Sequence, residues 1–211
     1  MNLLQVALTT KCNFSCSHCP MAQWRNTTPK YPLNNTELIP FIEQYCKPKD
    51  WIIELTGGEP ALYDGLDKLL QWLSLNQYRV LIKTNGSLPI NKYRKITRCA
   101  AFHNYEAPPK YYDLYLIING LDSDRKIQYC REHRIPYRLI GLDKTPLPDQ
   151  YHSFVYMAFI NAAGHQIGCP AATATENEVD GVDLNRITHR PLIPVRCCTN
   201  CKIAFDSWRF L

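Results

Sequence analysis

The sequence predicts an α/β protein built on a parallel sheet or a partial barrel. Short apolar runs alternate with segments of helical periodicity along residues 3–142, which is the pattern of strands joined by helical crossovers. The chain has 211 residues, whereas a complete (β/α)8 barrel usually needs about 250. Its composition, 45% apolar and 20% charged, is that of an ordinary globular domain. We therefore expect a parallel sheet or a shortened, partial (β/α)6 barrel.

Each expected element has a local signal. Apolar runs that end in glycine-containing or polar turns predict strands over 3–10, 51–60, 79–86, 99–104, 113–120 and 137–142. Helical spacing of apolar residues, or a capping residue, predicts helices over 33–46, 62–75, 89–96 and 122–134. Asn35 or Thr36 is the expected cap of the first helix, with Pro40 in its first turn. The helix over 62–75 has the clearest pattern, with five leucines on one face.

The chain changes character after residue 142. The stretch 143–150 contains two prolines and is typical of a linker. Residues 154–169 predict a β-hairpin with 161–164 in its turn, and the tail contains the run CCTNC. We therefore expect a core over 1–145 and a small C-terminal β-hairpin appendage over 151–211.

The chain contains ten cysteines, an unusually high number. Its start lacks the basic and long apolar regions of a signal peptide, and no apolar run is long enough to span a membrane. A cytoplasmic location is therefore expected, where thiols stay reduced. Cys46, Cys99 and Cys130 are isolated and are expected to be buried, inert thiols. The clustered cysteines are candidate metal ligands: Cys12, Cys16, Cys19, Cys169, Cys197, Cys198 and Cys201.

Cys12, Cys16 and Cys19 have C-x3-C-x2-C spacing and directly follow the first strand. Three thiolates on one loop can hold three corners of a [4Fe–4S] cluster and leave the fourth iron open to an exogenous ligand. Zinc is the alternative, although it prefers four protein ligands and only His18, between Cys16 and Cys19, is available as the fourth.

This loop resembles the signature of the radical S-adenosylmethionine (SAM) superfamily. TGGEP at 56–60, after the second strand, and KTNG at 83–86, after the third, resemble two further elements of that superfamily. The resemblance covers about residues 4–142. It is specific because three motifs occur in order, each at the end of an expected strand.

The resemblance implies that Cys12, Cys16 and Cys19 bind a [4Fe–4S] cluster whose open iron takes the amino and carboxylate groups of SAM. One electron then breaks a carbon–sulfur bond of SAM, and the resulting 5′-deoxyadenosyl radical abstracts a hydrogen atom from the substrate. It also implies a SAM pocket formed by His18, Gly57, Gly58, Glu59, Thr84, Asn85, His103 and Asn104.

Within this pocket the turn Gly57–Gly58–Glu59 is expected to present its carbonyls, and the Glu59 carboxylate, to the methionine ammonium; glycine permits the close approach. His18 is expected near the adenine. His103 and Asn104 end the fourth strand, where they would reach the ribose or the substrate. A simple turn for the glycines and Asn85, and a packed or surface histidine at 103, are the alternatives.

The C-terminal cysteines resemble the short "twitch" relative of the SPASM appendage, which carries an auxiliary [4Fe–4S] cluster. Gly164 and Cys169 have G-x4-C spacing, and Cys198 and Cys201 have C-x2-C spacing with Cys197 adjacent. The fuller pattern has a further cysteine before the hairpin, but residues 143–163 contain none. The fourth position therefore falls to Cys197, to an open iron or to a histidine such as His165 or His189, and zinc is again the alternative.

The expected function is that of a radical SAM enzyme, an isomerase or an oxidoreductase. The compact chain and its net charge of +5 favour a small molecule, nucleotide or nucleic acid, with hypermodified thymidine in phage DNA as the specific hypothesis. A maturase of ribosomal peptides and a small-molecule dehydrogenase are alternatives. A flavodoxin- or ferredoxin-like protein is the expected electron donor. The non-enzymatic alternative, a zinc protein that binds nucleic acid, leaves GGEP and KTNG without a purpose.

Overall fold

A computed structural model of the chain describes residues 2–17, 19, 22–104, 106–118, 122–140, 156–167, 178–179, 182–183, 186–188, 192 and 195–196. Several residues singled out in the sequence lie outside these ranges: His18, Cys169, His189, Cys197, Cys198 and Cys201. The expected linker over 143–150 also lies outside them.

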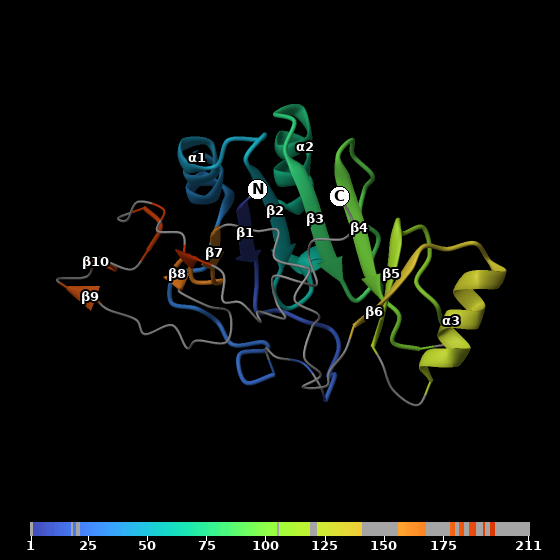
Figure 1. Ribbon diagram of the computed structural model, residues 1–211. Coiled ribbons are helices and arrows are strands. Elements are labelled where there is room, and N and C mark those ends of the chain that lie inside the picture. Colours follow the sequence, from blue (N-terminus) through green and yellow to red (C-terminus); the bar gives the residue numbers. More distant parts are fainter. Residues whose placement is uncertain are drawn as a thin grey trace.

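The centre of the molecule is a nine-stranded sheet (Figure 1). Its strands are β1 (Asn2–Ala7), β2 (Trp51–Thr56), β3 (Arg79–Thr84), β4 (Ile96–Ala101), β5 (Leu114–Ile118), β6 (Tyr137–Ile140), β7 (Tyr156–Ile160), β8 (Gln166–Ile167) and β11 (Val195–Arg196). The order β7-β1-β2-β3-β4-β5-β6 is parallel throughout, and β8 and β11 pair antiparallel with β7. In the described residues β6 and β7 end the parallel series at opposite edges, so the sheet is open, as a partial barrel requires. A separate two-stranded sheet joins β9 (Glu178–Val179) and β10 (Val182–Asp183).

Within the described residues, three helices and one short 3-10 segment connect the strands. They are α1 (Asn35–Tyr45), η1 (Pro60–Leu62), α2 (Leu66–Leu75) and α3 (Ser123–Glu132). The cap of α1 is Asn34, whose side chain accepts a hydrogen bond from Glu37 N, so the expected cap was one or two residues too late. Pro40 consequently lies beyond the first turn. None of the helices found among the described residues is long and apolar enough to cross a membrane.

The short helix expected over 89–96 is wrong, and so are the bounds of the strand expected over 99–104. β4 begins at Ile96 and ends at Ala101. Lys95, the residue directly before this strand, has a left-handed conformation (φ 61°). Ile90 is buried in the core, and its carbonyl accepts a hydrogen bond from Arg98. A helix as short as the one expected over 89–96 is only marginally stable by itself. Tertiary contacts therefore decide the conformation of this segment.

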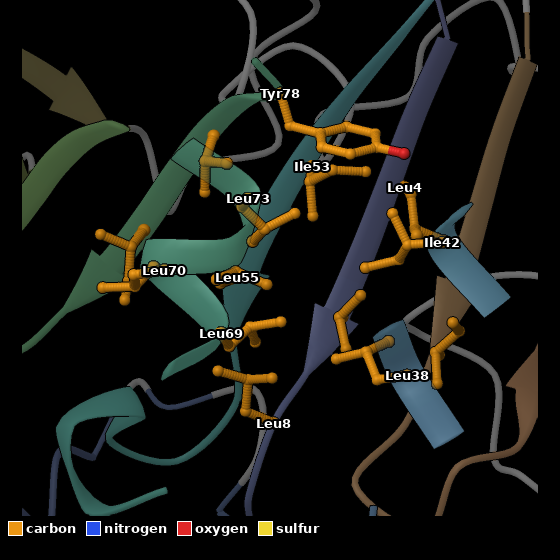
Figure 2. Close-up of a cluster of buried hydrophobic side chains, with 14 of the residues drawn as sticks. Leu4, Leu8, Leu38, Ile42, Ile53, Leu55, Leu69, Leu70, Leu73 and Tyr78 are labelled. Carbon is orange, nitrogen blue, oxygen red and sulfur yellow. The ribbon is translucent and has the colours of Figure 1, made fainter. Parts of the chain in front are cut away.

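The main core lies between the sheet and the helices. Figure 2 shows Leu38 and Ile42 of α1 and the leucines of α2 facing alternate residues of the strands, among them Leu4, Ile53 and Leu55. Because side chains alternate along a strand, the residues between these project from the opposite face, which we call the inner face. Its members on neighbouring strands include Leu3, Gln5, Ile52, Glu54, Leu81, Lys83 and Cys99.

The expected β-hairpin is present, and its place in the fold is a finding. β7 and β8 pair antiparallel around the turn at 161–164, while β7 also pairs with β1 as the seventh parallel strand. Arg186 fastens this edge, because its guanidinium donates to the Ala163 carbonyl (2.6 Å) and to the Glu37 carboxylate (Nε–Oε1 2.8 Å) of α1. The hairpin therefore continues the main sheet, and the existence of a separate appendage within 151–211 stays a prediction.

Candidate functional site

The candidate site lies where the parallel strands end. Loops that follow β1, β2, β3 and β4 leave the same edge of the sheet, which is where open parallel sheets bind ligands. These loops carry the cysteine triplet, the GGEP turn, the TNG turn and His103. The fold thus brings together the three motifs that the sequence placed at strand ends.

Backbone hydrogen bonds lock the GGEP turn against the cysteine loop. Gly58 N donates to the Thr9 carbonyl (2.6 Å), and Glu59 N donates to the Lys11 carbonyl (2.7 Å), one residue before Cys12. A Cβ atom on Gly58 would lie 2.1 Å from the Lys11 carbonyl oxygen, and one on Gly57 (φ 131°) would lie 2.6 Å from that of Thr9. Glycine is therefore needed at both positions for two loops to touch, a role that the sequence did not reveal.

Glu59 is fully buried, and its carboxylate is used inside the protein. Oε1 accepts hydrogen bonds from the Thr84 hydroxyl (2.6 Å) and from Ala61 N (3.0 Å), and Oε2 accepts one from Asn85 N (2.7 Å). These bonds cap η1 and join the GGEP turn to the TNG turn. Glu59 and Thr84 thus position the loops, and the contact of the Glu59 carboxylate with a methionine ammonium stays a prediction.

Asn85 connects the TNG turn to the cysteine loop. Its amide Nδ2 donates to Asn13 Oδ1 (2.8 Å), and Asn13 in turn donates to the Ser87 hydroxyl (2.9 Å). Asn85 Oδ1 also accepts a hydrogen bond from Ser87 N (2.9 Å), as in an Asx turn. The turn role weighed for Asn85 is therefore present, and it extends to the neighbouring motif.

The three cysteines of the triplet are partly exposed. The Cys12 backbone is held by its N–H, which donates to Asn26 Oδ1 (2.8 Å), and Cys12 Sγ accepts a hydrogen bond from Phe14 N (3.5 Å). Burial, followed by negative charge at Cys19 and Cys12, raises the pKa of Cys16. The thiols therefore lie close enough to influence one another. Within the described residues, however, no three Cys, His, Asp or Glu side chains converge tightly enough to hold a metal ion.

The donor set of this loop fits a [4Fe–4S] cluster. Three partly exposed thiols follow one strand, and an N–H···S hydrogen bond of the kind that stabilises a thiolate is already formed at Cys12. Thiolates repel each other until a cation joins them, which is why metal binding completes the geometry of such a loop.

His103 lies beside the same loop. Its Nδ1 is 3.9 Å from Cys16 Sγ, and its ring meets the Phe14 ring edge-on at 5.5 Å between centroids. The buried Lys126 of α3 donates to the His103 carbonyl (3.0 Å) and so fixes the backbone there. Asn104 instead accepts a hydrogen bond from Glu106 N (3.0 Å) in a local turn. Contact of either residue with SAM or substrate stays a prediction.

A cavity of about 900 Å³ lies next to this site but on its outer side. It touches the chain after β1 at residues 8–11. The rest of its lining comes mainly from residues 26–34 before α1 and from residues 62–64, with Glu37, Ala162, Arg186 and Thr188. Among the described residues, Cys12, Cys16, Cys19, the GGEP glycines, Glu59 and Thr84 do not border it. The chemistry of the motifs therefore does not face this cavity.

Three residues that the sequence did not single out help to build the site. Asn13, Asn26 and Ser87 supply the side-chain hydrogen bonds that join the cysteine loop to its neighbours. Asn13 follows Cys12 and Ser87 follows the TNG turn, so their positions next to the motifs could have indicated a role in the site. Asn26 lies 14 residues from its partner Cys12, and no pattern in the sequence indicates that pairing.

Comparisons with known proteins agree with this geometry. A family model described as the radical SAM superfamily matches residues 6–145. A 7-carboxy-7-deazaguanine synthase from Methanothermobacter thermautotrophicus is 37% identical over 83 residues, which is 39% of this chain and 33% of that protein. A GTP 3',8-cyclase from Helicobacter pylori is 26% identical over 153 residues, covering 69% of this chain and 43% of its own length. The chain thus spans less than half the length of these curated relatives.

Solved structures share the fold. SuiB from Streptococcus suis bound to S-adenosylmethionine superposes with a TM-score of 0.56 at 12% identity, over 79% of this chain and 60% of that one. BtrN in complex with AdoMet and 2-DOIA gives a TM-score of 0.51 at 16% identity, over 89% of this chain and 78% of that one. At such identities the likeness concerns the fold alone, which supports the partial barrel.

Proposed function

The chain belongs to the radical SAM superfamily, and from that premise we propose that it cleaves S-adenosylmethionine reductively and acts on a nucleobase or nucleotide. The observation that carries the first half is the locking of the GGEP turn onto the cysteine loop, with Gly58 N 2.6 Å from the Thr9 carbonyl. A zinc-binding loop has no need of this neighbour. A SAM site does, because it requires cluster ligands and a backbone platform side by side.

Cys12, Cys16 and Cys19 would hold a [4Fe–4S] cluster. When bound, such a cluster supplies the electron that cleaves SAM into methionine and a 5′-deoxyadenosyl radical, and this radical removes a hydrogen atom from the substrate. The chain's own residues orient the reactants. Gly57 and Gly58 keep the turn beside the cluster loop, while Glu59, Thr84 and Asn85 hold the turn in place.

The remaining cofactor-binding roles are proposals of the same kind. His103, whose carbonyl accepts a hydrogen bond from Lys126 and whose ring lies 3.9 Å from Cys16 Sγ, would contact SAM or the substrate, and so would Asn104, which follows it. His18 is assigned to the adenine by resemblance alone. The electron would come from a flavodoxin- or ferredoxin-like donor, for which the net charge of +5 suits an acidic partner.

The names of the relatives support the substrate class. One group is named for the synthesis of a deazaguanine, and the other is named for GTP. Hypermodified thymidine in DNA is the finer form of the proposal, since it offers a nucleobase and a polyanion to a basic protein. Faster SAM cleavage with peptides, or with another small molecule, would instead indicate a peptide maturase or a small-molecule dehydrogenase.

We also propose a second [4Fe–4S] cluster on Cys169, Cys197, Cys198 and Cys201, within a C-terminal unit over 151–211 that follows a core over 1–145. The experiment is a count of iron, sulfide and zinc per chain after anaerobic reconstitution. About eight irons per chain indicate two clusters, and about four indicate one. Zinc without iron would contradict the whole proposal.

The function is tested by SAM cleavage. The reconstituted enzyme is reduced with dithionite or with reduced flavodoxin, and 5′-deoxyadenosine is measured with GTP, thymidine-containing DNA carrying 5-hydroxymethyluracil, or a mixture of peptides. We expect faster release with a nucleotide or with the modified DNA. Acceleration by peptides alone would instead favour the maturase. Equal release with all of them would remove the support for a nucleic-acid substrate.

A further inference from the structure

Glu54 is a buried charge that the proposed SAM site does not use. It lies on β2, and its side chain is fully buried. Figure 2 shows Ile53 and Leu55, its neighbours along β2, within the core beneath the helices, so Glu54 projects from the inner face. It stands two positions before Thr56, after which the GGEP turn begins; this is about 7 Å along a strand.

Its two carboxylate oxygens have different surroundings. Oε1 accepts a hydrogen bond from Gln5 Nε2 of β1 and forms an ion pair with Lys83 Nζ of β3 (3.1 Å). Oε2 is buried and has no hydrogen-bond partner among the described residues. A buried carboxylate oxygen without a donor lowers stability, so such an oxygen in a folded protein requires an explanation.

The area beside Glu54 is apolar. Leu81, Cys99, Leu114 and Leu116 form one buried cluster on the strands β3, β4 and β5. Leu81 stands directly opposite Glu54 in the register of β2 and β3. A few polar groups next to an apolar patch are what a planar, polar-edged ligand needs.

The charges of Glu54 and Lys83 limit which ligand groups can bind at Oε2. Lys83 already neutralises Glu54, so a second cation gains little there, and the carboxylate repels phosphate. A neutral N–H donor satisfies Oε2 without adding charge. The base of a nucleotide, rather than its phosphate, therefore suits this position.

We propose that Glu54 Oε2 accepts a hydrogen bond from the ring N–H of the substrate's nucleobase, namely the cyclic-amide N–H that guanine and thymine share. This inference rests on the proposed function and deepens it. It puts the base on the inner face, one step below the turn that we assign to SAM. Gln5 and Lys83 then act as positioning residues that hold the carboxylate through Oε1.

The test compares nucleotides with analogues that lack only this hydrogen. The reconstituted enzyme with SAM, kept without reductant so that no turnover occurs, is equilibrated with GMP, dTMP, 1-methyl-GMP and 3-methyl-dTMP, and dissociation constants are measured by equilibrium dialysis. We expect methylation to weaken binding of the preferred nucleotide by at least about tenfold. In Glu54→Ala, which removes the acceptor and opens space for the methyl group, the difference is expected to fall below about threefold.

Asp113→Asn is the matched control. It removes another carboxylate of the same sheet region, one whose oxygens are paired with Arg98 and Lys92, and it keeps the full effect of methylation. Thermal unfolding confirms that each variant is folded, and the wild-type comparison stands even if Glu54→Ala is not.

Two results would overturn the inference while leaving the nucleotide proposal intact. One is a wild-type enzyme that binds methylated and unmethylated forms equally. The other is an unchanged effect of methylation in Glu54→Ala, which would mean that the N–H is read elsewhere and that Oε2 bonds only to water. Absence of binding by both GMP and dTMP also overturns it, whereas the proposed function is judged separately by SAM cleavage.

Discussion

Two fully buried glutamates, five residues apart, stand in different regions and show different chemistry. Glu59 at the strand ends has donors for both carboxylate oxygens, all from the chain itself. Glu54 on the inner face has two partners on Oε1 and none among the described residues on Oε2. Burial is the same for both, so burial alone does not separate a structural carboxylate from one that awaits a ligand. The two glutamates differ in that Glu54 Oε2 has no hydrogen-bond partner among the described residues.

The same difference extends to the regions around them. At the strand ends, backbone and side-chain bonds join three loops into one platform, and motifs mark each loop in the sequence. On the inner face no motif marks Gln5 or Glu54, although Lys83 is the first residue of the KTNG motif. A motif reports what a whole superfamily shares, which is the handling of SAM. We propose that a substrate of this chain is recognised on the inner face.

The largest expected contrast concerns thiol reactivity. Burial raises the pKa of Cys99, on the inner face, to about 12, whereas Cys12 and Cys19 are partly exposed at the strand ends. At pH 8 the alkylation of Cys99 in the folded, cluster-free protein should be about a thousandfold slower than the alkylation of Cys12 and Cys19, because the thiolate is the reactive form. Mass spectrometry of iodoacetamide-treated protein measures this. Comparable labelling of Cys99 would mean that the inner face opens readily.

The next effect concerns the contact between loops. Gly58→Ala places a Cβ 2.1 Å from the Lys11 carbonyl oxygen, so the GGEP turn must leave the cysteine loop. We expect a loss of about 3 kcal/mol or more in stability and SAM cleavage reduced about a hundredfold, with less iron bound. Gly65→Ala is the control. It strains a left-handed backbone (φ 90°) and so costs stability too, but its Cβ meets only the end of the Asn35 side chain and does not touch the cysteine loop, so iron binding should be kept. Equal iron loss in both variants would speak against a specific contact.

A comparison of Glu59→Gln with Glu54→Gln tests the two glutamates directly. At position 59 an amide must direct N–H toward a group that already donates, so we expect a loss of about 2–3 kcal/mol. At position 54 the oxygen that Gln5 uses is retained and Oε2 had no partner. The main loss is the ion pair with the partly exposed Lys83, so we expect a smaller loss of about 1 kcal/mol. Urea unfolding gives both values. A reversed order would break the comparison.

The smallest expected effect belongs to Asp113, whose carboxylate is paired but partly exposed. Burial opposes ionisation, but hydrogen bonds from Arg98 and Lys92 hold the pKa of Asp113 below its usual value of 3.8. A lowered carboxyl pKa stabilises the fold above the unfolded value and is lost as pH falls through the folded value. Asp113→Asn should therefore cost about 1 kcal/mol at pH 7, given solvent screening, and nearly nothing near pH 2. Urea unfolding at both pH values checks this, and a constant difference would exclude titration of Asp113 as the cause.

Local patterns determined most of the fold. The expected strands over 51–60 and 79–86 appear as Trp51–Thr56 and Arg79–Thr84, because apolar runs bounded by glycine turns have few alternatives. The buried state of Cys46, Cys99 and Cys130 is confirmed, and so is the hairpin around 161–164. The helix predicted over 89–96 is wrong because Asn91 and Tyr93 donate hydrogen bonds to Asp67 of α2, a partner that no local pattern reveals.

The sequence by itself determined the strand-and-helix alternation, the three motifs at strand ends and hence the superfamily, because each depends on residues close together in the chain. Only the tertiary structure decided that β7 joins β1, that Gly58 touches the cysteine loop, and that Glu59 is satisfied while Glu54 is not. Those features depend on atoms from strands far apart in the chain. The polar balance of a buried group becomes visible only when all of its neighbours are in place.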